Sequence, residues 1–125
     1  MAIYHFDRNG VSPAAGSSAV KASAYISGAT VFRELTASKC SYRRAERVVA
    51  HGVKLPEAAP DEYRDPEALW NAAEAAQRGN ECYAHRENMA LPIELASIDG
   101  EFERLMEDYA ERVVKETGHA VEWAI

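Results

Sequence analysis

Residues 17–30 read SSAVKASAYISGAT, a stretch in which a single tyrosine stands among residues that are nearly all small. Ser17 or Ser18 is suited to begin a helix, because a serine oxygen accepts a free backbone N–H of the first turn. The helix is predicted to run to about Gly28, with Tyr25 near its end. A helical tyrosine usually packs against larger apolar side chains, so the space around this phenol needs an explanation.

Two explanations for that space are open. Four neighbours fall within about 60° of Tyr25 around the helix axis, and these are Lys21, Ala22, Gly28 and Ala29. A helix face rich in alanine and glycine often makes a close contact with a sheet. The same lack of bulk would let a substrate reach the phenol oxygen, and Lys21 could favour a phenolate or hold a phosphate.

The sequence on either side of this helix predicts alternating strands and helices. Strands are expected over residues 2–6, 48–56, 82–92 and 120–125. Further helices are expected from Pro66 to just before Gly79 and from Phe102 to just before Gly118. Residues 8–18 are expected to form a loop, 30–35 a loose helical tail, and 38–47 a loop or hairpin tip.

This order, β-α-β-α-β-α-β with one uncertain hairpin after the first helix, predicts an α+β fold. A central, mostly antiparallel sheet with helices stacked on one face would bury the apolar stripes of the helices. With 125 residues, the chain is expected to form one domain, residues 1–125. Because it stops inside a predicted strand, that domain is expected to be incomplete at its C-terminus.

The charge is distributed unevenly along the chain. Residues 1–56 carry eight Lys and Arg against three Asp and Glu, a balance of +5, whereas the remaining residues carry six against 17, a balance of −11. Such asymmetry is a hint of contact with a polyanion. An acidic, solvated helix face in the second half would produce much of the same difference.

Several classes of protein are disfavoured. No apolar run has the length of a membrane span, and the first residues lack the pattern of a signal peptide. Cys40 and Cys82 lie far apart without C-x-x-C spacing, and they are expected to be free thiols. A cytoplasmic monomer without membrane contact is predicted.

Several motifs of the chain occur together in one order. They are MAIYHF, a Gly/Ser-rich turn, SAVKASAYISG, LPEAAP, DPEALWNAAE and ALPIEL. In this combination the whole chain resembles the start of the MobA/MobL relaxases, the DNA nicking and strand-transfer enzymes of mobilisable plasmids. The resemblance implies the relaxase version of the His-hydrophobic-His fold.

The resemblance also implies a nucleophile. In that family the tyrosine of the A-Y step attacks the scissile phosphodiester and stays joined to the 5′ phosphate, and Tyr25 occupies this position. A phenol, whose ordinary pKa is about 10, is a poor nucleophile at neutral pH. It needs a base, a positive charge or a metal nearby.

The family's metal site cannot be identified in the sequence of this chain. The resemblance implies a divalent ion, Mg²⁺ or Mn²⁺, held by a histidine followed by an H-x-H pair, and these are expected beyond Ile125. The chain's own histidines, His5, His51, His85 and His119, form no such pair. The chain alone is therefore expected to have little or no nicking activity, because it lacks the ion that would stabilise the developing charge.

A second departure concerns the acidic group. The family often has a site glutamate in the strand that ends with A-L-P, and the corresponding positions here are Arg86 and Asn88. Glu87 is the candidate acid, but it lies one residue off and would face the other side of a regular strand. A β-bulge could restore it.

The expected DNA contacts are basic. Arg43, Arg44 and Arg47 beside Tyr42 suit phosphate binding with base stacking nearby, and Lys21 is added to this set from its place beside Tyr25. Three arginines in a surface loop are also common without any partner. By resemblance, the partners are single-stranded or supercoiled origin-of-transfer DNA, accessory mobilisation proteins and the type IV secretion apparatus.

Two other functions remain open. One is a non-catalytic fragment that binds single-stranded DNA through its basic first half. The other is an inactive α/β remnant that serves as an interaction domain, with the acidic helix carrying Glu103, Glu107 and Glu111 as its main surface.

Overall fold

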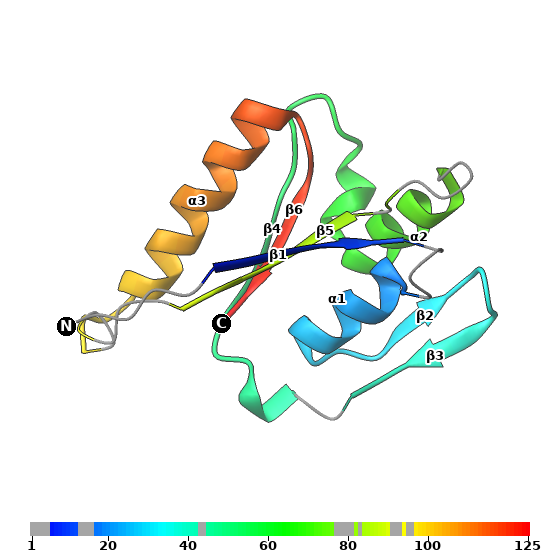
Figure 1. Cartoon of the computed structure of the whole chain (residues 1–125), viewed down its shortest axis with the longest axis horizontal. Helices are drawn as coiled ribbons and strands as arrows, with labels where there is room; N and C mark the ends of the chain where they lie inside the picture. The colour runs from blue at the N-terminus through cyan, green and yellow to red at the C-terminus, as the bar shows by residue number, and fades with distance from the viewer. Residues whose placement is uncertain are drawn as a thin grey trace.

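The computed structural model of the chain describes residues 6–12, 17–42, 45–76, 82, 84–90, 94 and 97–125. The strands are β1 Phe6–Val11, β2 Val31–Arg33, β3 Ser38–Cys40, β4 His51–Lys54, β5 Ala84–Met89 and β6 Val121–Ala124. The α-helices are α1 Ala19–Ser27, α2 Pro66–Ala76 and α3 Glu101–Thr117, and the 3₁₀ helices are η2 Ala45–Arg47 and η3 Asp61–Arg64. Figure 1 shows how these elements are arranged.

The strands of the described residues pair as three antiparallel ladders, β1 with β5, β2 with β3, and β4 with β6. The α+β class and the antiparallel pairing are confirmed. The single central sheet of the prediction is divided, in the part of the chain that the structure describes, into two-stranded units. A hairpin follows the first helix, as β2–β3, but its turn lies between Arg33 and Ser38 and not in the predicted residues 38–47.

The helices cover both faces of the strand layer, and the prediction that they stack on one face was wrong. On β6, Glu122 accepts a hydrogen bond from Trp70 of α2, whereas its neighbour Trp123 donates one to Glu107 of α3. Adjacent residues of a strand point to opposite faces. Strands β4 and β6, with β1 and β5, therefore lie between α3 on one side and α1 with α2 on the other, whereas β2 and β3 pack against α1 on the side away from α3 (Figure 1).

The β4–β6 ladder depends on a close approach between Gly52 and Trp123, which are directly paired. A Cβ atom at Gly52 would lie 2.6 Å from the indole of Trp123, a distance that no side chain tolerates. Glycine at this position therefore lets the large ring lie across the neighbouring strand, where only 6% of it remains exposed.

Two strands form where the sequence predicted irregular structure. The first predicted strand, residues 2–6, lies mostly outside the described residues, and β1 instead covers residues expected to be a loop. Asp, Asn and Gly are depleted in strands, but all six residues of β1 are paired with β5. Pairing between distant segments thus overrides the weak local preference.

The second unpredicted strand is β2, whose outer edge is paired by side chains of α2. Glu67 and Asn71 accept hydrogen bonds from the N–H groups of Phe32 and Glu34, at 2.6 Å and 2.9 Å, and Asn71 donates to the carbonyl of Phe32 at 2.7 Å. These side chains satisfy backbone groups that would otherwise be left open at the strand edge. This explains why Asn71 is buried on a helix whose predicted stripe was apolar.

The helix that carries the tyrosine has the predicted ends. The Ser18 hydroxyl accepts a hydrogen bond from the N–H of Lys21, and Gly28 ends the helix in the left-handed conformation, with φ of 72°. Val20 and Ala24 are fully buried and cluster with Val31 and Cys40. Some of the small residues of this stretch therefore allow close packing in the core.

Candidate functional site

Tyr25 lies at the boundary between this core and the surface. Its side chain is half-buried, and of its small neighbours Ala22 and Gly28 are half-buried while Ala29 is exposed. The small residues thus divide into two sets, one that packs in the core and one that leaves the surroundings of the phenol open.

Two aromatic contacts fix the position of the Tyr25 ring. The ring of Tyr42, which follows β3, meets it edge-on, with centroids 5.5 Å apart and an angle of 81° between the planes. The guanidinium carbon of Arg86, from β5, lies 5.0 Å from the centre of the Tyr25 ring. Both geometries are favourable, the first because of the ring quadrupole and the second as a cation–π contact.

Arg86 and Glu87 are neighbours on β5 but serve opposite faces. Arg86 reaches Tyr25, whereas the Glu87 carboxylate accepts a hydrogen bond from the hydroxyl of Tyr109 on α3 at 2.6 Å and lies 3.5 Å from the Arg8 guanidinium. The β1–β5 register is continuous from Phe6 opposite Met89 to Val11 opposite Ala84. No bulge therefore returns Glu87 to the face of Tyr25, and its role as an acid stays a prediction.

The other predicted DNA contacts are only partly described. Lys21 and Arg47 are exposed, Lys21 on α1 and Arg47 at the end of η2. Arg43 and Arg44 lie outside the described residues. Tyr42 contacts Tyr25 and is 42% exposed, and its stacking on bases stays a prediction.

The beginning of α1 is held by a buried ionic group that was not predicted from the sequence. The Glu74 carboxylate, whose side chain is 1% exposed, accepts hydrogen bonds from the Ser18 hydroxyl at 3.0 Å and from Arg33 Nε at 2.7 Å. Glu67, Asn71 and Glu74 are spaced four and three residues apart, so they form one stripe along α2. That spacing was the signal in the sequence that could have revealed this polar face.

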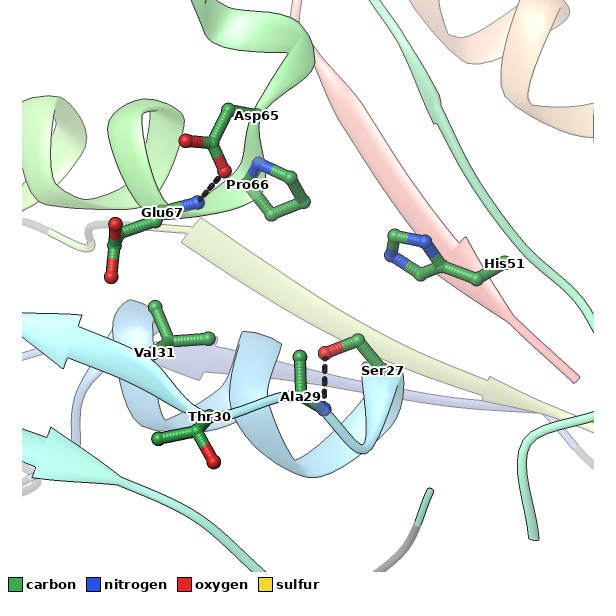
Figure 2. Close-up of a pocket in the computed structure, with 8 residues that line it drawn as sticks. All are labelled: Ser27, Ala29, Thr30, Val31, His51, Asp65, Pro66 and Glu67. Carbon is green, nitrogen blue, oxygen red and sulfur yellow. Dashed lines mark hydrogen bonds between the residues drawn. The ribbon is translucent and has the colours of Figure 1, made fainter. Parts of the chain in front are cut away.

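A cavity of about 270 Å³ lies at the other end of α1, between α1, β4 and the start of α2 (Figure 2). Eight residues line it: Ser27, Ala29, Thr30, Val31, His51, Asp65, Pro66 and Glu67. Two of its polar side chains are engaged locally, since Ser27 accepts from the N–H of Ala29 and Asp65 accepts from that of Glu67. Of the neighbours of Tyr25, Ala29 lines this cavity, but Tyr25, Tyr42 and Arg86 do not. The cavity is therefore adjacent to the candidate site at Tyr25 and not part of it.

His51 lines the cavity and binds a buried carboxylate. Its Nε2 lies 2.5 Å from Glu122 Oε2, and Glu122, with a side chain that is 1% exposed, also accepts from Trp70 Nε1 at 2.7 Å. His51 lies on β4 and Glu122 on the paired strand β6, so this contact joins the two strands through their side chains.

The described residues contain no group of three or more His, Cys, Asp or Glu side chains arranged to hold a metal ion. His85 and His119 are exposed on β5 and after α3, and His5 lies outside the described residues. The part of the chain that the structure describes thus does not fit the metal site of the family.

Tyr109, the partner of Glu87, differs from Tyr25 in its surroundings. Burial of the phenol, followed by its hydrogen bond to Glu87, raises the pKa of Tyr109 to about 12. This tyrosine is therefore held in its neutral form, which is the form that donates a hydrogen bond.

Among the described residues, no helix is long and apolar enough to cross a membrane. Cys40 is buried and Cys82 exposed, and both are free thiols.

Comparison with solved structures finds one close in fold. The structure described as "Molecular Basis of Vancomycin Resistance Transfer in Staphylococcus aureus" superposes with a TM-score of 0.86 at 29% sequence identity. The match covers 97% of this chain and 61% of that chain.

Sequence comparison places the chain in a family. It is 36% identical over 126 residues to the "Probable mobilization protein MobA" of Bifidobacterium longum (strain NCC 2705), a match that covers 100% of this chain and 22% of the relative. The chain thus spans about a fifth of the length of that relative. The model of the MobA/MobL family matches residues 17–125. The resemblance inferred from the motifs is confirmed, and the chain belongs to the MobA/MobL family.

Proposed function

We propose that the chain is the tyrosine-bearing part of a conjugative relaxase, which nicks single-stranded DNA at a transfer origin by transesterification. The Tyr25 oxygen forms a bond to the scissile phosphorus and loses its proton, while the bond from phosphorus to the 3′ oxygen breaks. The 3′ oxygen takes up a proton and leaves as a hydroxyl, and the 5′ phosphate stays on the tyrosine. No phosphodiester energy is lost, so a 3′ hydroxyl can later reverse the step.

The observation that carries this proposal is the setting of Tyr25. Its ring is fixed from two directions by Tyr42 and Arg86, on a helix whose first turn is tied down by Glu74. Fixed orientation of an attacking group removes part of the entropic barrier to reaction. The small residues on the outer side leave room for a DNA strand to approach.

The proposed DNA contacts use the basic first half of the chain. Exposed Lys21 lies one turn before Tyr25, and exposed Arg47 follows Tyr42 in the chain. We include Arg43 and Arg44 in this proposal on their sequence position alone. Transfer-origin DNA, accessory mobilisation proteins, a type IV secretion apparatus and a cytoplasmic location are all part of the same proposal.

A divalent ion, Mg²⁺ or Mn²⁺, is the cofactor proposed for the family, and such an ion would stabilise charge on the leaving oxygen. The described residues offer no cluster for it. We therefore propose that its ligands lie after Ile125. Removal of metal with a chelator tests whether nicking depends on it.

A second candidate function rests on the exposed cations Lys21 and Arg47 alone. A fragment that binds single-stranded DNA without cutting it would keep Lys21 and Arg47 but need no metal. In that case, binding would be salt-dependent and would survive Tyr25→Phe, and no covalent product would form.

The test of the main proposal uses the complete gene product that contains this chain and a supercoiled plasmid with its transfer origin. The proposal predicts nicked circles and DNA bound to protein after denaturation, both absent from the Tyr25→Phe variant. Nicking that persists in this variant would overturn the role of Tyr25. Binding without nicking in either protein would favour the second candidate.

A further inference from the structure

Arg86 is the one charged residue of the described chain with a buried nitrogen that has no hydrogen-bond partner. Its Nε is inaccessible to solvent and has no acceptor, and the only other such side-chain atom in the described part is the hydroxyl of Ser23. A buried donor without an acceptor costs about 1–3 kcal/mol. Such a group in a folded protein calls for an explanation, and an absent ligand is one of them.

The contrast with other arginines shows that the chain can supply acceptors. Carboxylates pair with four arginines: Arg8 with Glu87, Arg33 with Glu74, Arg64 with Asp61, and Arg104 with Glu101 and Asp108. Three of these are exposed on the surface, where a partner is least needed. Arg86 is half-buried, yet no carboxylate among the described residues reaches it.

The contact that Arg86 does make limits what it can do. The guanidinium lies over the ring of Tyr25. An arginine side chain in a protein keeps its proton and has no atom that can accept a hydrogen bond. It therefore cannot take the phenol proton, which a carboxylate at the same place could do. It can instead attract and hold an anion beside the phenol.

Phosphate is the anion whose geometry fits this group. The planar fork of a guanidinium donates charge-assisted hydrogen bonds to phosphate oxygens, which are shorter and stronger than neutral ones. A phosphorus atom bonded to the phenol oxygen of Tyr25 would lie at the rim of the ring over which Arg86 sits. Its non-bridging oxygens would then be within reach of the same guanidinium.

We propose that Arg86 is a phosphate-binding residue, which holds a non-bridging oxygen of the phosphodiester at Tyr25. This proposal rests on the proposed function, because it gives Arg86 the phosphate that Tyr25 attacks. Arg86 also positions the ring of Tyr25 through the cation–π contact, so binding of the phosphate and orientation of the nucleophile are provided by one side chain.

The test measures how DNA binding depends on salt. Fluorescein-labelled oligothymidylate is titrated with the full chain at several NaCl concentrations, and the logarithm of the binding constant is plotted against that of the salt concentration. Each phosphate contact to a single strand contributes about −0.7 to this slope. For Arg86→Met we expect a slope shallower by about 0.7 and binding weakened about tenfold at low salt.

Two further variants control for charge and folding. Arg104→Gln removes one positive charge from an exposed, paired site on α3 and should leave the slope unchanged. Arg86→Lys keeps a cation at the site and should restore most of the slope. A circular dichroism spectrum of each variant checks that it is folded.

The proposal is overturned if folded Arg86→Met keeps the wild-type slope, if Arg104→Gln changes it equally, or if the chain does not bind oligothymidylate at low salt. Failure of the proposed function is distinguishable. Tyr25→Phe keeps Arg86 and should keep the salt slope, whereas only the covalent product reports on Tyr25 as a nucleophile.

Discussion

The two faces of β5 each join a charged residue to a tyrosine, and the two pairs differ in how completely their polar groups are satisfied. On the face toward α3, Glu87 accepts from the hydroxyl of Tyr109 and lies beside Arg8. On the face toward α1, Arg86 lies over the ring of Tyr25, and its Nε has no acceptor.

The difference separates stability from function on one strand. The Glu87–Tyr109 pair satisfies its members within the protein, as is usual for buried polar groups. The Arg86–Tyr25 pair leaves a buried donor open at a half-exposed phenol, which costs stability but leaves capacity to bind an anion. Such a trade of stability for activity is common at functional sites.

The largest predicted effect distinguishes Tyr25 from Tyr109, the tyrosines that contact the two faces of β5. Tyr25→Phe should reduce formation of the covalent protein–DNA product at least ~1,000-fold, because no other group replaces a missing nucleophile. Tyr109→Phe, the matched change on the other face, should leave the product unchanged. The measurement is the amount of DNA that remains bound to the complete gene product after denaturation. Equal losses in both variants would contradict the assignment.

The next effect concerns the support of α1. Glu74→Gln should lower the free energy of unfolding by about 3 kcal/mol, because it leaves the buried guanidinium of Arg33 without its negative partner. Urea unfolding of the full chain measures this change. As a control, Glu111→Gln on α3 alters an exposed pair with Lys115 and should change stability by less than ~0.5 kcal/mol. Similar values for the two variants would show that the Glu74 group does not anchor the helix.

Replacing Glu87 and Arg86 in turn by methionine compares the stability contributions of the two faces of β5. Glu87→Met should lower the free energy of unfolding by about 1–3 kcal/mol, because the hydroxyl of Tyr109 loses its acceptor. Arg86→Met should leave it unchanged or raise it, because a donor without an acceptor is removed. Chemical unfolding of both variants measures these free energies. A larger loss for Arg86→Met would show that the guanidinium serves stability.

The smallest effect is a dependence on alkaline pH. The pKa of Tyr109, about 12 in the folded protein, exceeds the ordinary phenol value of about 10. The native state therefore holds this proton more tightly, so its contribution to stability is complete below pH ~10 and is lost as the pH rises toward 12. The stability difference between wild type and Tyr109→Phe should shrink over this interval. A stability difference that does not change with pH would contradict the raised pKa of Tyr109.

Local signals in the sequence were enough for the helices and for the position of Tyr25. Ser18 and Gly28 bound α1 as predicted, and the apolar spacing before Gly118 identified α3. The period of two along a strand also predicted that Glu87 and Arg86 would point to opposite faces of the strand. These features depend on residues close together in the chain, which a sequence pattern can report.

Features that depend on distant segments were missed. The strand β2 has its edge satisfied by Glu67 and Asn71, about 35 residues later in the chain. The two-sided strand layer depends on which helix meets each of Glu122 and Trp123. The contact of Arg86 with Tyr25 joins β5 to α1 across the fold, so no local pattern announces it.

The most direct test of the central claim is the identity of the residue joined to DNA. The complete gene product is incubated with its transfer-origin DNA and divalent metal, then digested with nuclease and trypsin and analysed by mass spectrometry. Cleavage after Lys21 and Arg33 gives a peptide in which Tyr25 is the only tyrosine. We predict that this peptide carries a 5′-phosphorylated nucleotide on Tyr25. Nicked DNA with the nucleotide on another residue, or with no covalent product, would contradict the account.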